Sequence, residues 1–200
     1  MDNAIVETPR KLTALVLGCA LGLLAGCGFS LDPGHIEPAD PGSVVCIDGV
    51  EIKLLRYSTR CERPSTKSLV AEVGDGMEFS ADQVRTLDAP CAESPNPGVE
   101  IHVAHSSLIF DFSNVANPGR FPVADFEGYV IDILPGEDNA HLVRATVDSE
   151  ENSLGMENAD LRFDFDRLEV NFQDISYDES AFVRINLWFV SAALMEHAAQ

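Results

Sequence analysis

Basic residues are scarce in this sequence of 200 residues, which has 13 lysines and arginines against 33 aspartates and glutamates. The net charge of −20 repels phosphate backbones and therefore argues against a nucleic-acid-binding protein. The same charge repels anionic lipid headgroups, whereas it attracts divalent cations and basic partners. The simplest explanation of the acidic excess is a solvated surface that keeps the protein soluble.

Familiar catalytic and metal-binding spacings are missing as well. No Gly-x-Ser-x-Gly elbow follows residue 27, no pair of cysteines has the Cys-x-x-Cys spacing, and Gly74-Asp75-Gly76 is too short to cradle a phosphate. His102 and His105 lie three residues apart, so on a strand they would point to opposite faces and could not share a metal ion. The sequence therefore favours a non-enzymatic protein over an enzyme of a known class.

The longest apolar run is too short for a typical membrane-spanning helix. It covers Leu12–Ala25, which is 14 residues, and it follows the basic pair Arg10-Lys11. A charged start and an apolar core of this length are typical of a secretory signal peptide. The run closes with Leu24-Ala25-Gly26-Cys27, which resembles the lipobox of bacterial lipoproteins.

This resemblance implies a lipid anchor and a cleavage site. In bacterial lipoproteins the cysteine thiol is joined to a diacylglycerol, the chain is cut just before that cysteine, and the new amine is often acylated. On this chain the cut would fall between Gly26 and Cys27. Two or more acyl chains give stable membrane attachment. In an organism with two membranes, Gly28 rather than aspartate after Cys27 favours the outer membrane.

Two alternatives to this cleavage site remain open. Cys19 follows Val16-Leu17-Gly18, a poorer box whose use would leave an apolar core shorter than signal peptides need. The other alternative is an uncleaved membrane helix over Leu12–Leu31, which its four glycines would weaken. In either case Arg10-Lys11 stay inside the cell and the rest of the chain faces outward.

We divide the chain into four parts. They are a signal peptide (1–26), a proline- and glycine-rich linker (27–43), a β domain (44–190) and a C-terminal tail (191–200). Export would allow disulfide formation, so one pair among Cys46, Cys61 and Cys91 is expected, and the three pairings stay open.

Short stretches of alternating apolar and polar residues, separated by turn-forming clusters, dominate the β domain. The predicted strands are Val50–Tyr57, Ser68–Val73, Val99–Ala104, Leu108–Phe112, Tyr129–Leu134, Leu142–Val147, Leu161–Phe165, Leu168–Phe172 and Phe182–Val190. A short helix over Ser80–Leu87, capped by Ser80, interrupts them. The pattern predicts an all-β, antiparallel β-sandwich, with a jelly roll as the second choice.

The apolar phase switches from odd to even positions across Asp166-Arg167. A two-residue turn there predicts a hairpin in which 165 pairs with 168, 163 with 170 and 161 with 172, so that all six apolar side chains share one face. A β-bulge would also explain the switch. With Phe163 in the core, Phe163→Asp is expected to be badly tolerated.

Two acidic turns are candidate Ca²⁺ sites, because calcium prefers hard oxygen ligands. The first consists of Asp132, Glu137, Asp138 and Asn139, and the second is Asp148–Asn152. Neither spacing matches a known calcium loop, so solvated turns are the alternative explanation.

Trp188 falls on the polar phase of its strand, together with Arg184 and Asn186. An exposed tryptophan beside polar groups can serve as a sugar-stacking or partner-binding platform. Alternatively, a loop or a second layer of the fold covers its ring.

These observations lead to three hypotheses of function. The first is a membrane-anchored, exported lipoprotein whose β domain has an interaction or structural role, with an envelope protein or a polysaccharide as partner. The second is a Ca²⁺-assisted module that binds carbohydrate or another extracellular polymer. The third is a secreted hydrolase with an unfamiliar site.

Overall fold

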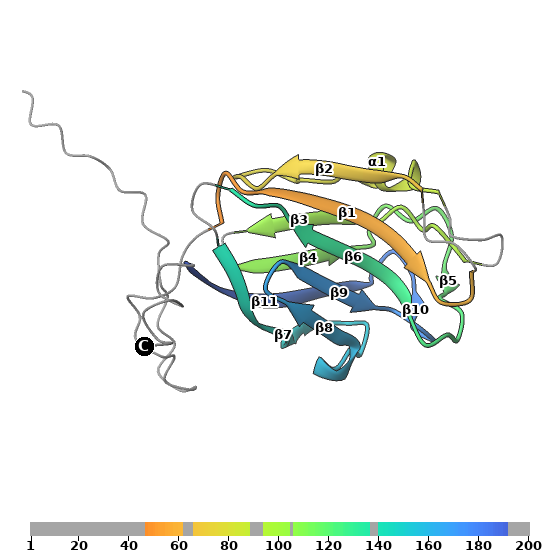
Figure 1. The fold of residues 1–200 in the computed structure, drawn as a ribbon. Helices are drawn as coiled ribbons and strands as arrows, with labels where there is room; N and C mark the ends of the chain where they lie inside the picture. Colours follow the sequence, from red (N-terminus) through yellow and green to blue (C-terminus); the bar gives the residue numbers. More distant parts are fainter. Residues whose placement is uncertain (1–46, 62–65, 89–93, 105, 137–139, 192–200) are drawn as a thin grey trace, which may run out of the picture. The chain divides into compact units, whose positions relative to one another are not determined.

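The computed structural model describes residues 47–61, 66–88, 94–104, 106–136 and 140–191, all within one compact unit of the chain (Figure 1). They form antiparallel strands, one short α-helix, α1 (Ala81–Arg85), and one 3₁₀ turn, η1 (Asn158–Asp160). In the described part of the chain, no helix is both long and apolar enough to cross a membrane. The predicted all-β fold is confirmed.

Two antiparallel sheets make up the body of the domain. In spatial order, the five-stranded sheet contains β2 (Ser68–Glu72), β1 (Glu51–Ser58), β6 (Glu127–Ile133), β9 (Arg167–Asn171) and β8 (Leu161–Asp164). The four-stranded sheet contains β3 (Glu100–Ala104), β4 (Ser107–Asp111), β11 (Phe182–Ser191) and β7 (Ala140–Asn152). A small ribbon pairs β5 (Gly119–Arg120) with β10 (Ser176–Tyr177).

The core lies between the two sheets, which Figure 1 shows one behind the other. Phe110 on β4 contacts Tyr129 on β6 with ring centroids 5.6 Å apart, so the inner faces of the two sheets meet directly. Phe172, at the end of β9, packs edge-on against Phe110 at 5.1 Å. Each buried ring of this kind contributes about 1.5–3 kcal/mol, so the sandwich is stabilised by the apolar phase of its strands.

Residues Ser80 to Leu87 contain the helix that the sequence predicts. The Ser80 side chain accepts a hydrogen bond from the backbone of Gln83, and the Gln83 side chain accepts one from the backbone of Ser80. This reciprocal capping box satisfies two amides that a helix start leaves unpaired. Val84 on the inner side of α1 is fully buried, which fixes the helix against the sandwich.

One predicted acidic loop is part of a strand. We expected a break at Asp148–Asn152, but β7 continues through it and pairs Asn152 with Val183 of β11. A register shift between Val183 and Ile185 accommodates the extra residues of β7 as a bulge. Pairing with the long partner strand thus overrides the local turn preference of the acidic residues.

The predicted register of the hairpin formed by β8 and β9 is wrong by two residues. Phe163 pairs with Leu168 and Leu161 with Val170, so the turn consists of Phe165 and Asp166. Because the shift is even, the apolar residues keep the same face, but β8 is the edge strand of its sheet and has a neighbour on one side only. Phe163 is consequently 44% exposed, and our expectation that it lies in the core is wrong.

Several predicted features lie outside the described residues. These are the lipobox with Gly26 and Cys27, the linker, Cys46, Cys91, His105, residues 137–139 of the first acidic turn, and the tail after Ser191. Cys61 is disulfide-bonded. Its pairing with Cys46 or Cys91 therefore stays a prediction.

Candidate ligand-binding face

The outer face of the four-stranded sheet combines polar and apolar side chains that are half-exposed. His102 on β3, Ile109 on β4 and Arg184 on β11 lie in register across three strands, pointing away from the core. The residues before and after each of them along the strand are buried, so the alternation of the pleated strand defines this outer face. The sequence predicted the alternation, and pairing brings the three strands together.

A groove of about 410 Å³ crosses this face at one end of the strands. Apolar side chains of Met77, Ile109 and Phe182 contribute to its lining. Carboxylates also line it, from Asp75, Glu100 and Asp111. Within the described residues none of these three carboxylates forms an ion pair, so the groove suits a ligand that is basic and partly apolar.

Glu78 fixes the segment that borders this groove. Its buried carboxylate accepts hydrogen bonds from the backbone of Val103 at 2.6 Å and of Gly74 at 3.1 Å, and it contacts His102 Nδ1 at 3.1 Å. The turn before Met77 is therefore tied to β3 by one side chain. A carboxylate that accepts several hydrogen bonds in a buried position acts as a structural clamp rather than as a free catalytic base.

Trp188 lies further along the same face, on β11, and it is half-buried. The guanidinium of Arg144, its partner residue on β7, stacks over the indole with the carbon 4.7 Å from the ring centroid. Such a cation–π contact covers one face of the ring. The side chain over Trp188 thus comes from the neighbouring strand of the same sheet, and a sugar could stack on that face of the ring only if Arg144 moved.

Asp148, in the acidic second half of β7, is held by hydrogen bonds from its own strand and from β11. Its carboxylate accepts hydrogen bonds from the backbones of Glu150 and Glu151 and from the Asn186 amide. The bond from Glu150 is the main reason why the pKa of Asp148 is lowered; burial opposes it, and the bonds from Asn186 and Glu151 add to the lowering. The nearby Glu151 pairs with Arg184 at 2.7 Å. Local donors thus already satisfy much of this predicted calcium site.

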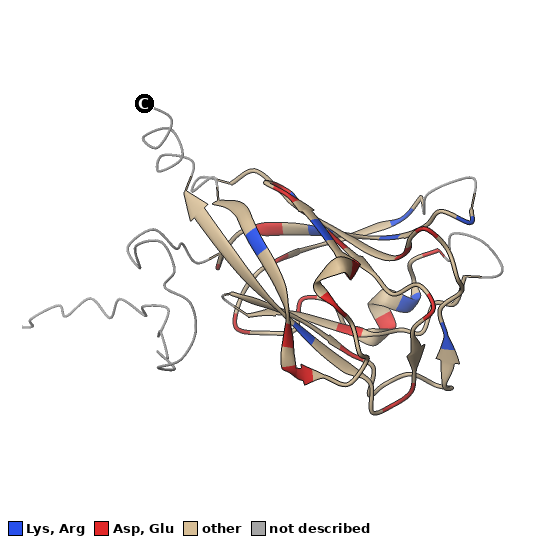
Figure 2. Cartoon of the chain, turned by 90° about the horizontal axis from the view of Figure 1, so that it is seen from below, with Lys and Arg blue, Asp and Glu red and all other residues tan. Residues whose placement is uncertain are grey.

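Asp132, from the other predicted calcium site, takes part in a charged network on the outer face of the five-stranded sheet. Its carboxylate contacts Lys53 on β1 at 3.6 Å and Arg167 on β9 at 2.7 Å. The hydrogen bond that Arg167 donates to Asp132 raises the pKa of Arg167. Among the described residues, no group of three or more acidic, histidine or cysteine side chains is arranged to hold a metal ion. Acidic residues are instead spread over many strands and loops (Figure 2).

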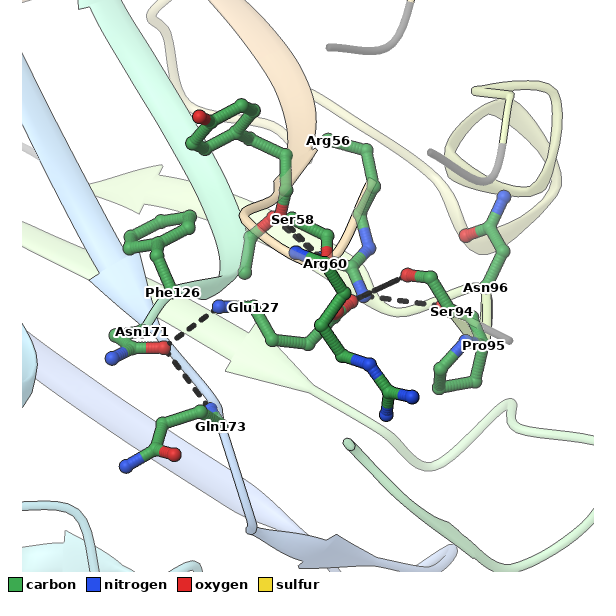
Figure 3. A network of polar contacts seen from close by, with 12 residues as sticks. Arg56, Ser58, Arg60, Ser94, Pro95, Asn96, Phe126, Glu127, Asn171 and Gln173 are labelled. Atoms are coloured by element: carbon green, nitrogen blue, oxygen red, sulfur yellow. Dashed lines mark hydrogen bonds and ion pairs between the residues drawn. The ribbon is translucent and has the colours of Figure 1, made fainter. Parts of the chain in front are cut away.

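A buried charge pair, which the sequence analysis missed, lies at one end of the five-stranded sheet (Figure 3). Arg56 on β1 and Glu127 at the start of β6 are fully buried, with Nη2 and Oε1 2.5 Å apart. Arg56 also donates to the carbonyl oxygens of Gly128 and Pro95, and Ser94 donates to Glu127 Oε1. The guanidinium is thereby held in place by residues of two further segments of the chain, 94–95 and 127–128.

Aromatic rings complete the surroundings of this pair. The Arg56 guanidinium carbon lies 5.2 Å from the ring centroid of Phe121 and 4.9 Å from that of Tyr129. Burial raises the pKa of Tyr129 to about 12. Arg56 occupies the inward phase after Ile52 and Leu54, so the alternation of β1 could have indicated a buried cation. Without the fold, nothing in the sequence identified Glu127 as its partner.

The chain matches no protein-family model, no curated protein and no solved structure. Its function must therefore be inferred from its own residues and geometry. The buried pair is enclosed and fits a structural role, because fully desolvated charges are kept where they are paired. The groove beside Met77 is open to solvent and is the better candidate for binding a partner.

Proposed function

We propose that this protein is an exported, membrane-anchored lipoprotein whose β-sandwich is a non-enzymatic interaction domain. The observation that carries the anchor is Leu24-Ala25-Gly26-Cys27 at the end of a 14-residue apolar run. Cys27 would carry the lipid, and the following segment, rich in proline and glycine, would connect it to the domain. In an organism with two membranes, the outer membrane is the favoured destination.

The groove on the four-stranded sheet supports the interaction role. Its apolar floor offers contact area, while Asp75, Glu100 and Asp111 offer unpaired negative charge to a basic segment of an envelope protein. With a net charge of −20 on the chain, long-range attraction would speed the encounter with such a partner.

Intact mass of the protein purified from membranes tests the anchor. The expected species begins at residue 27 and carries the mass of a diacylglycerol and, commonly, a further acyl chain. Cys27→Ala should release the protein from the membrane, whereas Cys19→Ala, the matched control in the poorer box, should leave it attached. A membrane-bound Cys27→Ala protein, or an unmodified N-terminus elsewhere, would refute lipidation at Cys27.

A second candidate function is Ca²⁺-assisted binding of a polysaccharide. It is favoured by Trp188 and Asn186 lying on the same face of β11, where Asn186 donates to Asp148, since a ring near polar groups is a combination that sugars use. Millimolar Ca²⁺ should then raise the melting temperature and EDTA should reverse the shift, with Mg²⁺ as the control. Trp188→Ala should weaken polysaccharide binding without unfolding the domain. An unchanged melting temperature in Ca²⁺ would count against this function.

A further inference from the structure

The hairpin between β8 and β9 presents two phenylalanines to solvent. Phe163 is 44% exposed and Phe165 is 49% exposed, whereas rings such as Phe110 and Phe172 are completely buried. Leaving a phenylalanine half-exposed forgoes roughly half of the stabilisation that full burial would give. Two such rings within three residues therefore indicate a surface that contacts another apolar phase.

This hairpin lies at the end of the sandwich where the chain enters the domain. The Phe165 carbonyl accepts a hydrogen bond from Leu142 N at 2.9 Å, at the start of β7, and the Asp166 carbonyl accepts one from Ile133 N at 2.7 Å, at the end of β6. Ile47, the first described residue, lines a small apolar cavity together with Ile133, Leu142 and other residues at this end. Figure 1 shows β1 and β7 beginning at this end.

The length of the connection to Cys27 limits how far this end of the domain can lie from the membrane. Residues 28–46, nineteen in number, separate the proposed lipid from Ile47. A random coil of nineteen residues would span about 25 Å on average. Once the anchor is inserted, the hairpin therefore encounters the bilayer surface at high effective concentration.

The charges beside the two rings suit a zwitterionic lipid surface. Residues 162–167 carry two arginines and two aspartates, so the segment itself has no net charge. A hollow of about 210 Å³ beside Phe163 is lined by two arginines, Arg162 and Arg167, and by two carboxylates, Asp164 and Glu169. Arg162 lies opposite Glu169 across the hairpin but forms no ion pair within the described part of the chain, so its guanidinium can bind a headgroup phosphate.

We infer that the hairpin Phe163–Arg167 inserts into the interface of the membrane that holds the protein. This inference rests on the lipid anchor of the proposed function. Phenylalanine rings enter the boundary between headgroups and acyl chains, while arginines stay at the level of the phosphates. The end carrying Phe163 and Phe165 then faces the bilayer, and the end carrying Arg56, Glu127 and the groove beside Glu100 faces away from it.

Tryptophan fluorescence of the lipidated, full-length protein tests this orientation. Trp188 is the only tryptophan of the chain, so Trp188→Phe gives a background without emission from indole. Phe165→Trp in that background places a reporter in the hairpin. Val123→Trp, at a residue 68% exposed just before β6, places a matched reporter at the opposite end.

The proteins are reconstituted into phosphatidylcholine vesicles with and without brominated acyl chains, and vesicle flotation is measured on the same samples. Bromolipid should quench roughly half or more of the emission from the indole at position 165, because an interfacial side chain lies about 5–10 Å deep in the boundary between headgroups and acyl chains. The indole at position 123 should not be quenched. Adding phosphatidylglycerol should reduce the quenching at position 165, because the acidic domain is repelled.

The possible failures are distinguishable. A protein that does not float with vesicles overturns the lipid anchor and this orientation with it. A protein that floats but shows equal quenching at positions 165 and 123, or none, overturns the orientation alone. If the indole at position 165 is protected from aqueous iodide but untouched by bromolipid, a protein surface such as a second copy covers the hairpin, and the inference is wrong.

Discussion

Glu127→Gln should destabilise the domain far more than its size suggests. The replacement keeps the shape of the side chain but leaves the Arg56 guanidinium, which is fully buried, without its counter-charge. Removing one partner of a buried ion pair typically costs about 3–5 kcal/mol, because the remaining charge stays desolvated. We expect a loss in this range, reduced towards its lower end by the carbonyls of Gly128 and Pro95, which still accept from Arg56.

Asp132→Asn is the matched control, because it makes the same change on the same strand, β6, but on the solvent side. Asp132 pairs with Lys53 and Arg167, whose side chains are 35% and 51% exposed. Partly exposed pairs contribute about 0–1 kcal/mol each, so this variant should lose little stability.

Urea unfolding monitored by circular dichroism measures both variants. With a denaturant dependence of about 2 kcal/mol per molar, Glu127→Gln should lower the midpoint by about 1.5–2.5 M and Asp132→Asn by about 0.5 M or less. The double variant Arg56→Met/Glu127→Leu should recover part of the loss, because neither charge then remains buried. Equal shifts for Glu127→Gln and Asp132→Asn would refute the assignment of the pair as a buried, coupled unit.

Two further predictions concern single side chains. Burial raises the pKa of Tyr129 from its ordinary value of 10.0 to about 12, so the domain should lose about 2–3 kcal/mol of stability as pH rises from 10 to 12, and Tyr129→Phe should abolish that part of the pH dependence in urea titrations. Ser80→Ala removes the capping box of α1 and should cost about 1 kcal/mol in the same assay, whereas Ser113→Ala, an exposed serine outside any helix, should cost close to nothing.

The strands were predictable because burial on one face imposes a period of two. All nine predicted strands are present, with ends shifted by a few residues, and Ser80 caps the helix as expected. The short strands β5 and β10 were not predicted, since two-residue segments such as Gly119–Arg120 carry no periodic signal. Their pairing depends on Tyr177 packing against Phe112 and Phe121 in the assembled core.

The candidate sites were less predictable, because they depend on which strands become neighbours. The alternation placed Trp188 on the outer face, but the stacking of Arg144 required the pairing of β11 with β7. Asp132 was singled out as an acidic turn residue, and its neutralisation by Lys53 and Arg167 follows from the order of β1, β6 and β9. Local sequence thus defines the face of a side chain, and topology defines its partner.

The hairpin between β8 and β9 shows the same limit and yields a test. Phe163 and Leu168 are paired across the hairpin and share a face, but Leu168 is 2% exposed whereas Phe163, on the edge strand, is 44% exposed. A charge at position 168 would be buried without a partner, so Leu168→Asp should cost more than about 3 kcal/mol or prevent folding. Phe163→Asp should cost less than about 1 kcal/mol, because the new carboxylate remains hydrated at the edge.

Thermal unfolding of the two variants distinguishes the register in the structure from the one that the alternation alone predicted. In the predicted register Phe163 pairs with Val170, which is fully buried, and Phe163→Asp would then be as damaging as Leu168→Asp. A ΔΔG of 1 kcal/mol corresponds to roughly 2–4 °C for a domain of this size, so the two outcomes are well separated. If Phe163→Asp unfolds at the same temperature as Leu168→Asp, β8 is a core strand and the structural register is wrong. Phe163 would then be buried, and the membrane-facing orientation would lose the exposed ring on which it depends.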